Sequence, residues 1–267
     1  MPIQLIIRNP LDRDAREYIG RAGVSDAAAR LQLNEFVRGI KSLGLYTSMV
    51  CWPLRSTQNA GTGTTAFSLG GLGTFNGTLV NGPTWGADGV VFTNASSQRL
   101  TFGSSQIILG NSDYSVFGAA KLTNVSAINL VVISMGNNRG SLVGVESNNG
   151  TRIRNATWSL SNTFPGAQLF GGPSTSFFSS FVAADAVSAK HFGNKTLAST
   201  LTGDYRVNPS PASLPQIGAH NLQPGDNGFW NGDIAAGALW NVKLTDAQVA
   251  SVYDLYKATL GTGLGLP

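Results

Sequence analysis

The chain has 267 residues, of which 42% are hydrophobic and only 12% are charged. A chain of this length and composition buries roughly 70 to 75% of its unfolded surface, and all-β sandwiches of this size commonly form one domain. The 33 glycines, set against only three glutamates at Glu17, Glu35 and Glu146, favour short strands and tight turns over long surface helices. We therefore expect a globular, mainly β protein.

The charge is moderately basic, with a formal net charge of +4 and an isoelectric point of about 9.4. The basic residues are scattered along the sequence, whereas nucleic-acid-binding proteins concentrate them on one face. The nearest approach to a cluster, Arg152 and Arg154, is more typical of a solvated strand face than of a phosphate or acidic-sugar site. We expect no nucleic-acid partner.

Cys51 is the single cysteine. One cysteine excludes an intrachain disulfide, and its apolar neighbours Val50 and Trp52 indicate a small buried hydrophobic residue. The apolar run at residues 3–7 is too short for the core of a signal peptide, and no run approaches the roughly 18 apolar residues of a membrane span. We expect no membrane insertion.

The first 55 residues carry the signals of helices. Residues 12–21 predict a short helix, and Ser25 is a suitable N-cap for a second helix that Gly44 would end. The second helix has one apolar stripe at helical spacing, formed by Leu33, Phe36, Val37, Ile40 and Leu43. Because such a stripe needs a surface to cover, we interpret its last four residues as the ones that anchor the chain to a partner protein.

The next segment, residues 56–73, has five glycines together with several serines and threonines. This composition favours flexible or irregular backbone. We therefore predict three parts: a helical anchoring segment at residues 1–55, a connector at residues 56–73 and a sandwich domain at residues 74–267.

From residue 75 onward the hydrophobic period is that of strands. Asn-Gly pairs such as Asn81-Gly82 and Asn227-Gly228 mark turns, because they supply the positive φ of type I′ hairpins. Ten strands are predicted, at residues 89–93, 98–102, 114–122, 128–134, 141–146, 152–160, 176–183, 195–199, 216–218 and 232–242. No amphipathic helices separate them, which predicts an antiparallel sandwich.

The sequence ends with a well-marked helix. Thr245 and Gln248 form a capping box, and Gly261 follows the last apolar residue. Between them lies an apolar stripe of Val249, Val252, Tyr253, Tyr256 and Leu260. We expect this stripe to pack on the sandwich.

Three stretches, residues 89–102, 113–122 and 232–244, resemble in this order the strands of laminin-G-like, concanavalin A-like jelly rolls. The resemblance covers roughly residues 75–260. It implies a mainly β fold: an antiparallel concanavalin A-like jelly-roll sandwich with an α-helical N-terminal segment and a short C-terminal helix.

A second resemblance lies in the helical lead-in, where Lys41-Ser-Leu-Gly-Leu-Tyr46 is followed by an apolar strand that ends at Trp52. This order is similar to the lead-in of jelly-roll proteins among the structural proteins of tailed-bacteriophage virions. A histidine and a charged stretch often follow in those proteins, whereas residues 56–73 are neutral here. The resemblance implies a virion protein, without indicating head or tail.

The residues that catalysis needs are scarce. Glycoside hydrolysis requires two carboxylates flanking the bond, and none of the three glutamates lies two or four positions from another carboxylate on a strand. His191 and His220 are the only histidines, which excludes a usual zinc site and leaves no evident serine-histidine triad. His191 is more typical of a surface or turn histidine. We expect no enzymatic activity.

Two kinds of ligand stay open. Asp226, Asn227, Asn231 and Asp233 supply oxygen ligands that could bind calcium, although such turns more often satisfy their own backbone; otherwise we expect no cofactor. An aromatic platform for sugars could come from Trp85, Trp158, Tyr205 and Trp230. The alternative is that these rings belong to the core.

We therefore predict a non-catalytic structural protein of a phage virion, made in the host cytoplasm, that displays its jelly roll as a capsid decoration or a fibre component. Its partners would be other virion proteins and further copies of itself. The alternative is a lectin-like adhesin or receptor-binding module that recognises host-surface glycans.

Overall fold

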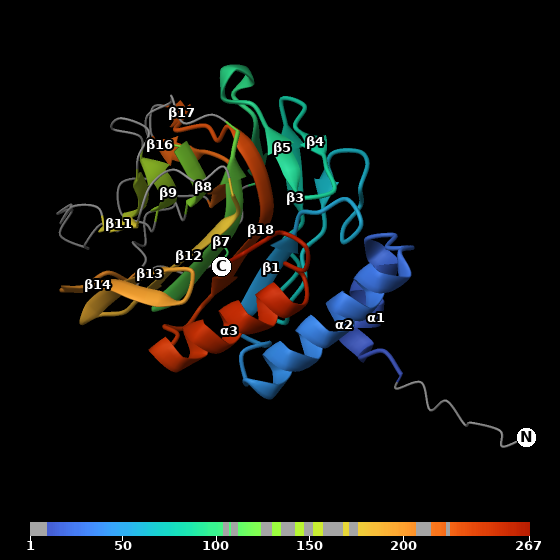
Figure 1. Cartoon of the computed structure of the whole chain (residues 1–267), viewed down its shortest axis with the longest axis horizontal. Helices are drawn as coiled ribbons and strands as arrows, with labels where there is room; N and C mark the ends of the chain where they lie inside the picture. The colour runs from blue at the N-terminus through green and yellow to red at the C-terminus, as the bar shows by residue number, and fades with distance from the viewer. Residues whose placement is uncertain are drawn as a thin grey trace, which may run out of the picture.

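The computed structural model describes residues 10–103, 107, 112–123, 130–134, 142–146, 152–156, 168–170, 176–206, 215–222 and 225–267. These residues form three layers: one layer of helices and two antiparallel sheets (Figure 1). The helices are α1 (Arg13–Arg21), α2 (Ala27–Ser42) and α3 (Asp246–Ala258). The expected sandwich of antiparallel sheets with terminal helices is confirmed.

The first sheet, sheet A, lies between the helices and the second sheet. Its strands follow the order β14 (Thr196–Thr202), β13 (Ser188–Gly193), β12 (Phe178–Ala184), β7 (Tyr114–Leu122), β18 (Gly232–Trp240), β5 (Val90–Phe92) and β4 (Thr84–Trp85), and β1 (Met49–Pro53) also pairs with β18. All the pairings are antiparallel.

The second sheet, sheet B, follows the order β11 (Gln168–Phe170), β10 (Arg152–Ala156), β9 (Leu142–Glu146), β8 (Leu130–Ser134), β15 (Gln216–Ile217), β6 (Arg99–Thr101), β3 (Gly77–Val80) and β2 (Thr65–Ala66). A separate hairpin joins β16 (His220–Leu222) to β17 (Gly225–Asn227), and a short 3₁₀ helix spans Asn94–Ser96. In the turn between β3 and β4, Asn81 and Gly82 both have positive φ, as a type I′ turn requires.

Strand β18 is the centre of sheet A. One of its edges pairs with β7, and the other is shared: Gly232 to Ile234 pair with β5, whereas Ala236 to Trp240 pair with β1. A register shift between Ile234 and Ala236 marks a bulge at the change of partner. The N-terminal segment is therefore joined to the sandwich by five residue pairs of β1.

Both faces of the central strands of sheet A are buried. Along β7, Val116 faces sheet B, while Phe117 faces the helices, because side chains alternate along a strand. Every described residue of β12, and every residue of β7 except Lys121, is buried. Double burial explains why these strands read as nearly unbroken apolar runs.

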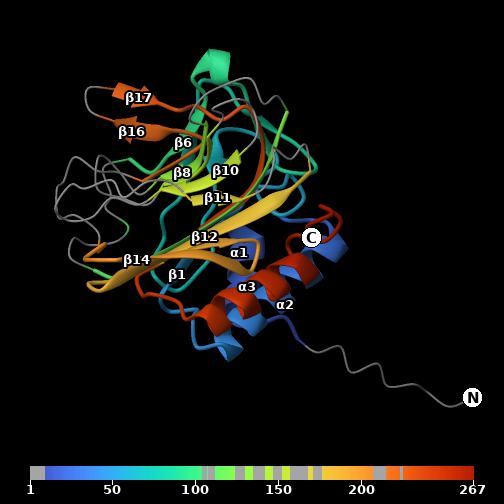
Figure 2. The ribbon, with the colours of Figure 1, turned by 60° about the vertical axis from the view of Figure 1, so that its left-hand side comes forward.

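The apolar stripe of α2 packs within the chain. Phe36, Val37 and Ile40 are buried in the same core as the helix-facing side chains of sheet A, and Leu43 packs against that core. This corrects the expectation that the stripe anchors a partner protein, because the surface that it covers is supplied by the chain's own sheet and α3. Helices α2 and α3 lie side by side in both views (Figures 1 and 2).

The helix ends follow the sequence signals with one correction. The N-cap of α2 is Asp26, one residue after the expected Ser25, and its carboxylate accepts a hydrogen bond of 2.7 Å from the Ala29 N–H. Gly44 follows the C-cap with φ of +70°. The capping box of α3 forms as predicted, with Thr245 and Gln248 each accepting from the other's backbone N–H.

The backbone of residues 56–73 is mostly irregular, as one of the two sequence alternatives predicts, but several of their groups are fixed against the sheets. Asn59 is buried, and its amide NH₂ donates to the Pro53 and Phe67 carbonyls at 2.6 and 3.0 Å. Cys51 and Leu69 exchange two backbone hydrogen bonds. Gly70 lies so close to the backbone of β1 that an added Cβ would be 2.1 Å from the Met49 oxygen, which explains one glycine of this stretch by close packing.

Among the described residues, no helix combines the length and the apolar character that crossing a membrane would require.

Candidate binding site

The aromatic residues that the sequence suggests for sugar binding do not form one platform among the described residues. Trp230 is fully buried, and Tyr205 is buried in the same core between the sheets, so neither ring can stack on a sugar from solvent. Trp85 is half-buried, and its indole N–H donates to the Gly63 carbonyl at 3.0 Å. Trp158 lies outside the described residues.

The residues suggested for calcium are placed only in part. The Asp233 carboxylate lies 3.5 Å from the Lys121 ammonium, which also lies 3.3 Å from Asp88. Asp233 therefore already shares the ammonium group of Lys121 with Asp88. Asp226 and Asn227 lie on β17, and the positions of their side chains are outside the description. The described residues contain no group of three His, Cys, Asp or Glu side chains that could hold a metal ion.

His191 is buried inside sheet A rather than exposed at a turn, which corrects the sequence interpretation. It lies on β13 opposite Val182, with the Ser199 hydroxyl 3.3 Å from its Nδ1 atom. Burial lowers the pKa of His191 to about 4, because the charged imidazolium loses its solvation. A buried, weakly basic imidazole is poorly suited to general-base catalysis at neutral pH.

A surface hollow of about 400 Å³ lies where α2 meets β1, and we call it the Tyr46 hollow. It is lined by Asp14, Lys41, Gly44, Tyr46, Thr47 and Gly71. The left-handed Gly44 turns the chain out of α2, so that the next residues form one wall. Gly71 forms the facing wall and donates a hydrogen bond of 2.9 Å to the Tyr46 carbonyl. An added Cβ at Gly71 would be 3.0 Å from the Thr47 Cα, so a glycine permits this approach.

Charged groups lie in and beside the Tyr46 hollow, where Lys41 and Asp14 line it and Asp12 contacts Lys41. The Lys41 ammonium lies 2.7 Å from Asp12, 2.5 Å from Asp14 and 4.9 Å from the centre of the Tyr46 ring. Asp12 is also the N-cap of α1, and Lys41 lies in the last turn of α2, so the ion pairs join the two helices with charges that suit both helix dipoles.

These contacts fix the protonation states. Partial burial alone would raise the pKa of Asp12, but the hydrogen bond from Lys41 and the Asp14 N–H outweigh it and lower that pKa. Burial would lower the pKa of Lys41, but the bonds to Asp12 and Asp14 outweigh it and raise that pKa. Burial raises the pKa of Tyr46, and Asp14 and Asp12 raise it further. The contacts therefore favour the charged forms of Asp12 and Lys41 and the neutral form of the Tyr46 phenol.

The Tyr46 hollow leaves polar groups available. Neither the Tyr46 hydroxyl nor the Thr47 hydroxyl has a hydrogen-bond partner among the described residues, and Thr47 is exposed. A partly exposed ring beside free hydroxyls and carboxylate oxygens combines an apolar surface with donors and acceptors. The volume falls within the usual range of small-molecule sites, roughly 300 to 1,000 Å³.

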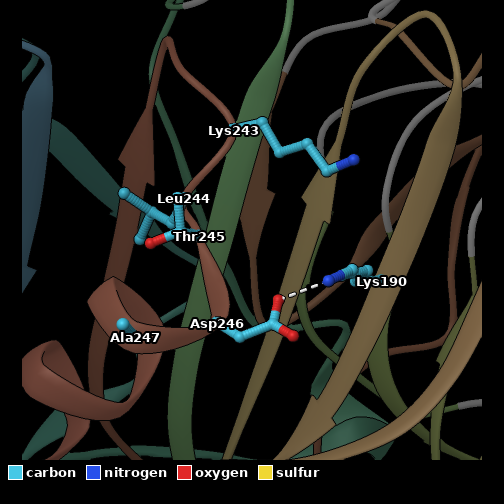
Figure 3. Close-up of a pocket in the computed structure, with 6 residues that line it drawn as sticks. All are labelled: Lys190, Lys243, Leu244, Thr245, Asp246 and Ala247. Atoms are coloured by element: carbon cyan, nitrogen blue, oxygen red, sulfur yellow. Dashed lines mark hydrogen bonds and ion pairs between the residues drawn. The ribbon is translucent and has the colours of Figure 1, made fainter.

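A second hollow, of about 410 Å³, lies between β13 and the start of α3 (Figure 3). It is lined by Lys190, Lys243, Leu244, Thr245, Asp246 and Ala247. Lys190 pairs with Asp246 at 2.6 Å, and Lys243 is bonded to Asp185 at 2.8 Å. Both ammonium groups are thus neutralised within the chain. Among the described residues, no aromatic ring lines this hollow, so they provide no surface on which a sugar ring stacks.

The sequence places Lys41 and Tyr46 in the lead-in motif but does not indicate a site there. Asp14 and Gly71 meet Tyr46 only through the packing of α1 and of residues 56–73 against the start of β1. The available signal was the pattern of a helix-ending glycine followed by an aromatic residue and threonine, which is too common to identify a site.

Known proteins resemble this chain in fold. The botulinum neurotoxin serotype D binding domain aligns with 79% of this chain and 52% of its own length, at 11% identity and a TM-score of 0.54. This chain therefore spans about half of that domain. The likeness, at this identity, establishes a concanavalin A-like jelly-roll sandwich.

Two carbohydrate-binding structures align at lower TM-scores. The CBM40 of a Ruminococcus gnavus IT-sialidase, bound to α2,3-sialyllactose, covers 54% of this chain and 83% of its own, at 15% identity and a TM-score of 0.46. Domain 4 of AbnA, a GH43 arabinanase of Geobacillus stearothermophilus in complex with arabinotriose, covers 77% and 87%, at 14% identity and a TM-score of 0.40. No family model matches the chain, and no curated relative matches it.

Proposed function

We propose that this chain is a non-catalytic, lectin-like module that binds glycans, and that its sugar site is the Tyr46 hollow. The observation that carries the proposal is the half-buried Tyr46 ring, which borders a hollow containing free hydroxyls and an ion-paired lysine. Sugars expose an apolar ring face surrounded by hydroxyls, and an aromatic ring beside charged hydrogen-bonding groups matches both features.

The charge in the hollow selects among sugars. Asp12 and Asp14 together outnumber Lys41 by one charge, so an acidic sugar would meet an excess of negative charge. The carboxylates accept hydrogen bonds from sugar hydroxyls, while Lys41 and Tyr46 donate. The expected ligand class is therefore a neutral glycan with free adjacent hydroxyl groups.

A glycan array with the full chain tests this proposal, followed by calorimetric titration of the best ligand. We expect binding to neutral glycans, with at least about tenfold loss in Tyr46→Leu, since stacking contributes roughly 0.5 to 1.5 kcal/mol beyond area burial and the ring also holds the hydroxyl. Trp85→Leu is the matched control, because it removes the other half-buried aromatic considered for sugar binding. Equal loss in both variants, or a flat array, contradicts the proposal.

The absence of catalysis is part of the same proposal. It is supported by the buried, weakly basic His191 and by the scarcity of glutamates. Incubating the chain with its best glycan ligand and measuring new reducing ends tests this point. Release of reducing ends above a no-protein control would overturn it.

We further propose that the module is displayed on a phage particle, which would make it an adhesin of the virion. The support is the similarity of its lead-in, Lys41 to Tyr46, to that of virion jelly-roll proteins. Since the stripe of α2 is covered within the chain, attachment would need an exposed residue such as Leu31, which is 60% exposed on the same helix. Mass spectrometry of purified particles should find the chain, and Leu31→Lys should reduce its amount. Particles that lack the wild-type chain exclude this role.

A further inference from the structure

The four ends of the two sheets differ in length. Sheet B ends in β2 and β11, with two and three residues, and sheet A ends on one side in β4, with two residues. Very short edge strands limit pairing with other chains. The other end of sheet A is β14, which has seven residues and pairs with β13 on one side and with no described strand on the other. Figure 2 shows β14 at the margin of the molecule.

Strand β14 also lacks the residues that protect edges. Its sequence from Thr196 to Thr202 contains no charged residue and no proline, which are the usual obstacles to edge pairing. Four of its residues and the apolar Leu197, which is 42% exposed, face solvent. Lys195 lies directly before the strand and is paired with Asp254 of α3 at 2.7 Å. Its charge is therefore held at the helix and does not protect the outer edge of β14.

A β-bulge hinders edge pairing along one half of β14 only. Ser199 pairs with His191 and Leu197 with Phe192, which leaves Ala198 as the extra residue of a bulge. Beyond the bulge, Ser199 to Thr202 pair with β13 without interruption, so this half of β14 keeps a straight outer edge.

We propose that β14 pairs with β14 of a second copy of this chain, antiparallel and about a two-fold axis, so that sheet A continues across the dimer. An axis at Thr200 places Thr200 opposite itself and Ser199 opposite Leu201, so that side chains of the same sheet face meet. The pairing brings no like charges together, because the strand has none. A second copy is the occupant that such self-complementary pairing fits.

Sedimentation equilibrium of the full chain over a range of concentrations tests this interface. We expect a reversible dimer, and we expect Thr200→Glu to weaken it by roughly tenfold or more, because like charges then meet across the axis. In the monomer the new carboxylate lies opposite the ammonium group of Lys190. This favourable pairing means that the substitution should not prevent folding. Thr78→Glu is the matched control, because Thr78 is exposed on β3, a strand paired on both sides.

A cross-link gives a second readout. Thr200→Cys should form an intermolecular disulfide under mild oxidation, whereas Thr78→Cys should not, and Cys51 is buried and does not compete. A chain that stays monomeric at every concentration overturns the proposal, as does a dimer that Thr200→Glu leaves unchanged. A dimer that Thr200→Cys fails to cross-link overturns the pairing through Thr200.

Discussion

The two faces of sheet A are covered by different structures. Sheet B covers one face with residues of the jelly roll, including Ile133 and Ile217, and this core is dominated by apolar side chains. The three helices cover the other face, in a core that includes Tyr18, Tyr256 and Cys51. The Tyr18 hydroxyl donates to the Gln58 carbonyl at 2.9 Å, which joins α1 to residues 56–73.

This difference shows what the N-terminal segment does. A detachable anchor would leave the outer face of sheet A complete without it, yet that face consists of large apolar residues such as Phe117, Phe181 and Trp240. The Phe117 ring lies 4.9 Å from that of Tyr256 on α3. The helices and the sheet therefore share one core, and exposing it would cost the free energy of burial of many side chains.

Deleting residues 1–55 is expected to have the largest effect. It removes β1, the partner of the central strand β18, and uncovers the core between sheet A and the helices, so we expect an aggregated chain rather than a folded sandwich. The soluble yield and the cooperativity of thermal unfolding measure the result. A soluble deletion variant with a sharp melting transition would show that the helical face is independent of the jelly roll.

Phe36→Ala tests the same interface with a single side chain. Phe36 is buried between α2 and the sheet, and we expect its truncation to lower the free energy of unfolding by about 3 to 5 kcal/mol. Leu31→Ala on the exposed side of the same helix is the control, with an expected change within about 0.5 kcal/mol. Urea unfolding distinguishes the two variants. Similar small changes in both would show that the packing of Phe36 against the sheet contributes little to stability.

The sequence predicted the long elements of this fold better than the short ones. Strand β7 has the predicted bounds, and α3 begins at its predicted capping box, because nine or more patterned residues give a clear period. Strands of two or three residues, such as β2 and β4, are too short to show a period. Strand β13 was not predicted, because its polar Lys190 and His191 interrupt the apolar pattern.

The proposed binding site could be predicted only to a small extent. The sequence suggested Trp230 and Tyr205 for their chemistry, but chemistry alone does not distinguish a buried ring from an exposed one, and both are in the core. The Tyr46 hollow depends on Asp14 and Gly71, which are far apart in sequence and meet through tertiary packing. The mistaken partner for the α2 stripe has the same origin, since an amphipathic pattern does not identify the surface that it covers.

The core between the two sheets predicts a loss of stability in acid, which arises from His191. His191 lies on the same face of β13 as Ala189, toward sheet B. Its pKa is lowered from 6.5 to about 4 by burial, so the unfolded chain takes up the proton first. Stability is therefore full above pH 6.5 and falls as the pH drops toward 4, by about 3 kcal/mol for this group.

Urea unfolding of the wild type and His191→Leu at pH 7, 5 and 4 measures this contribution, because the other titrating groups affect both proteins alike. The difference in unfolding free energy between them should change by about 3 kcal/mol over this range. A difference that stays constant with pH would show that His191 is accessible to protons in the folded state.

The smallest expected effect concerns the contact between α2 and α3. A Cβ at Gly39 would lie 2.5 Å from both terminal carbons of Leu255, so Gly39→Ala must displace that side chain, at a cost of roughly 1 to 3 kcal/mol. Alanine is favoured over glycine inside a helix by about 1 kcal/mol. We expect the substitution to destabilise the wild type slightly and to stabilise a Leu255→Ala background by about 1 kcal/mol. A double-mutant cycle compares the change in unfolding free energy in the two backgrounds, and a reversal of its sign shows that Gly39 and Leu255 are in tight contact. Stabilisation in both backgrounds would mean that Leu255 moves aside at little cost and that α2 and α3 are loosely packed.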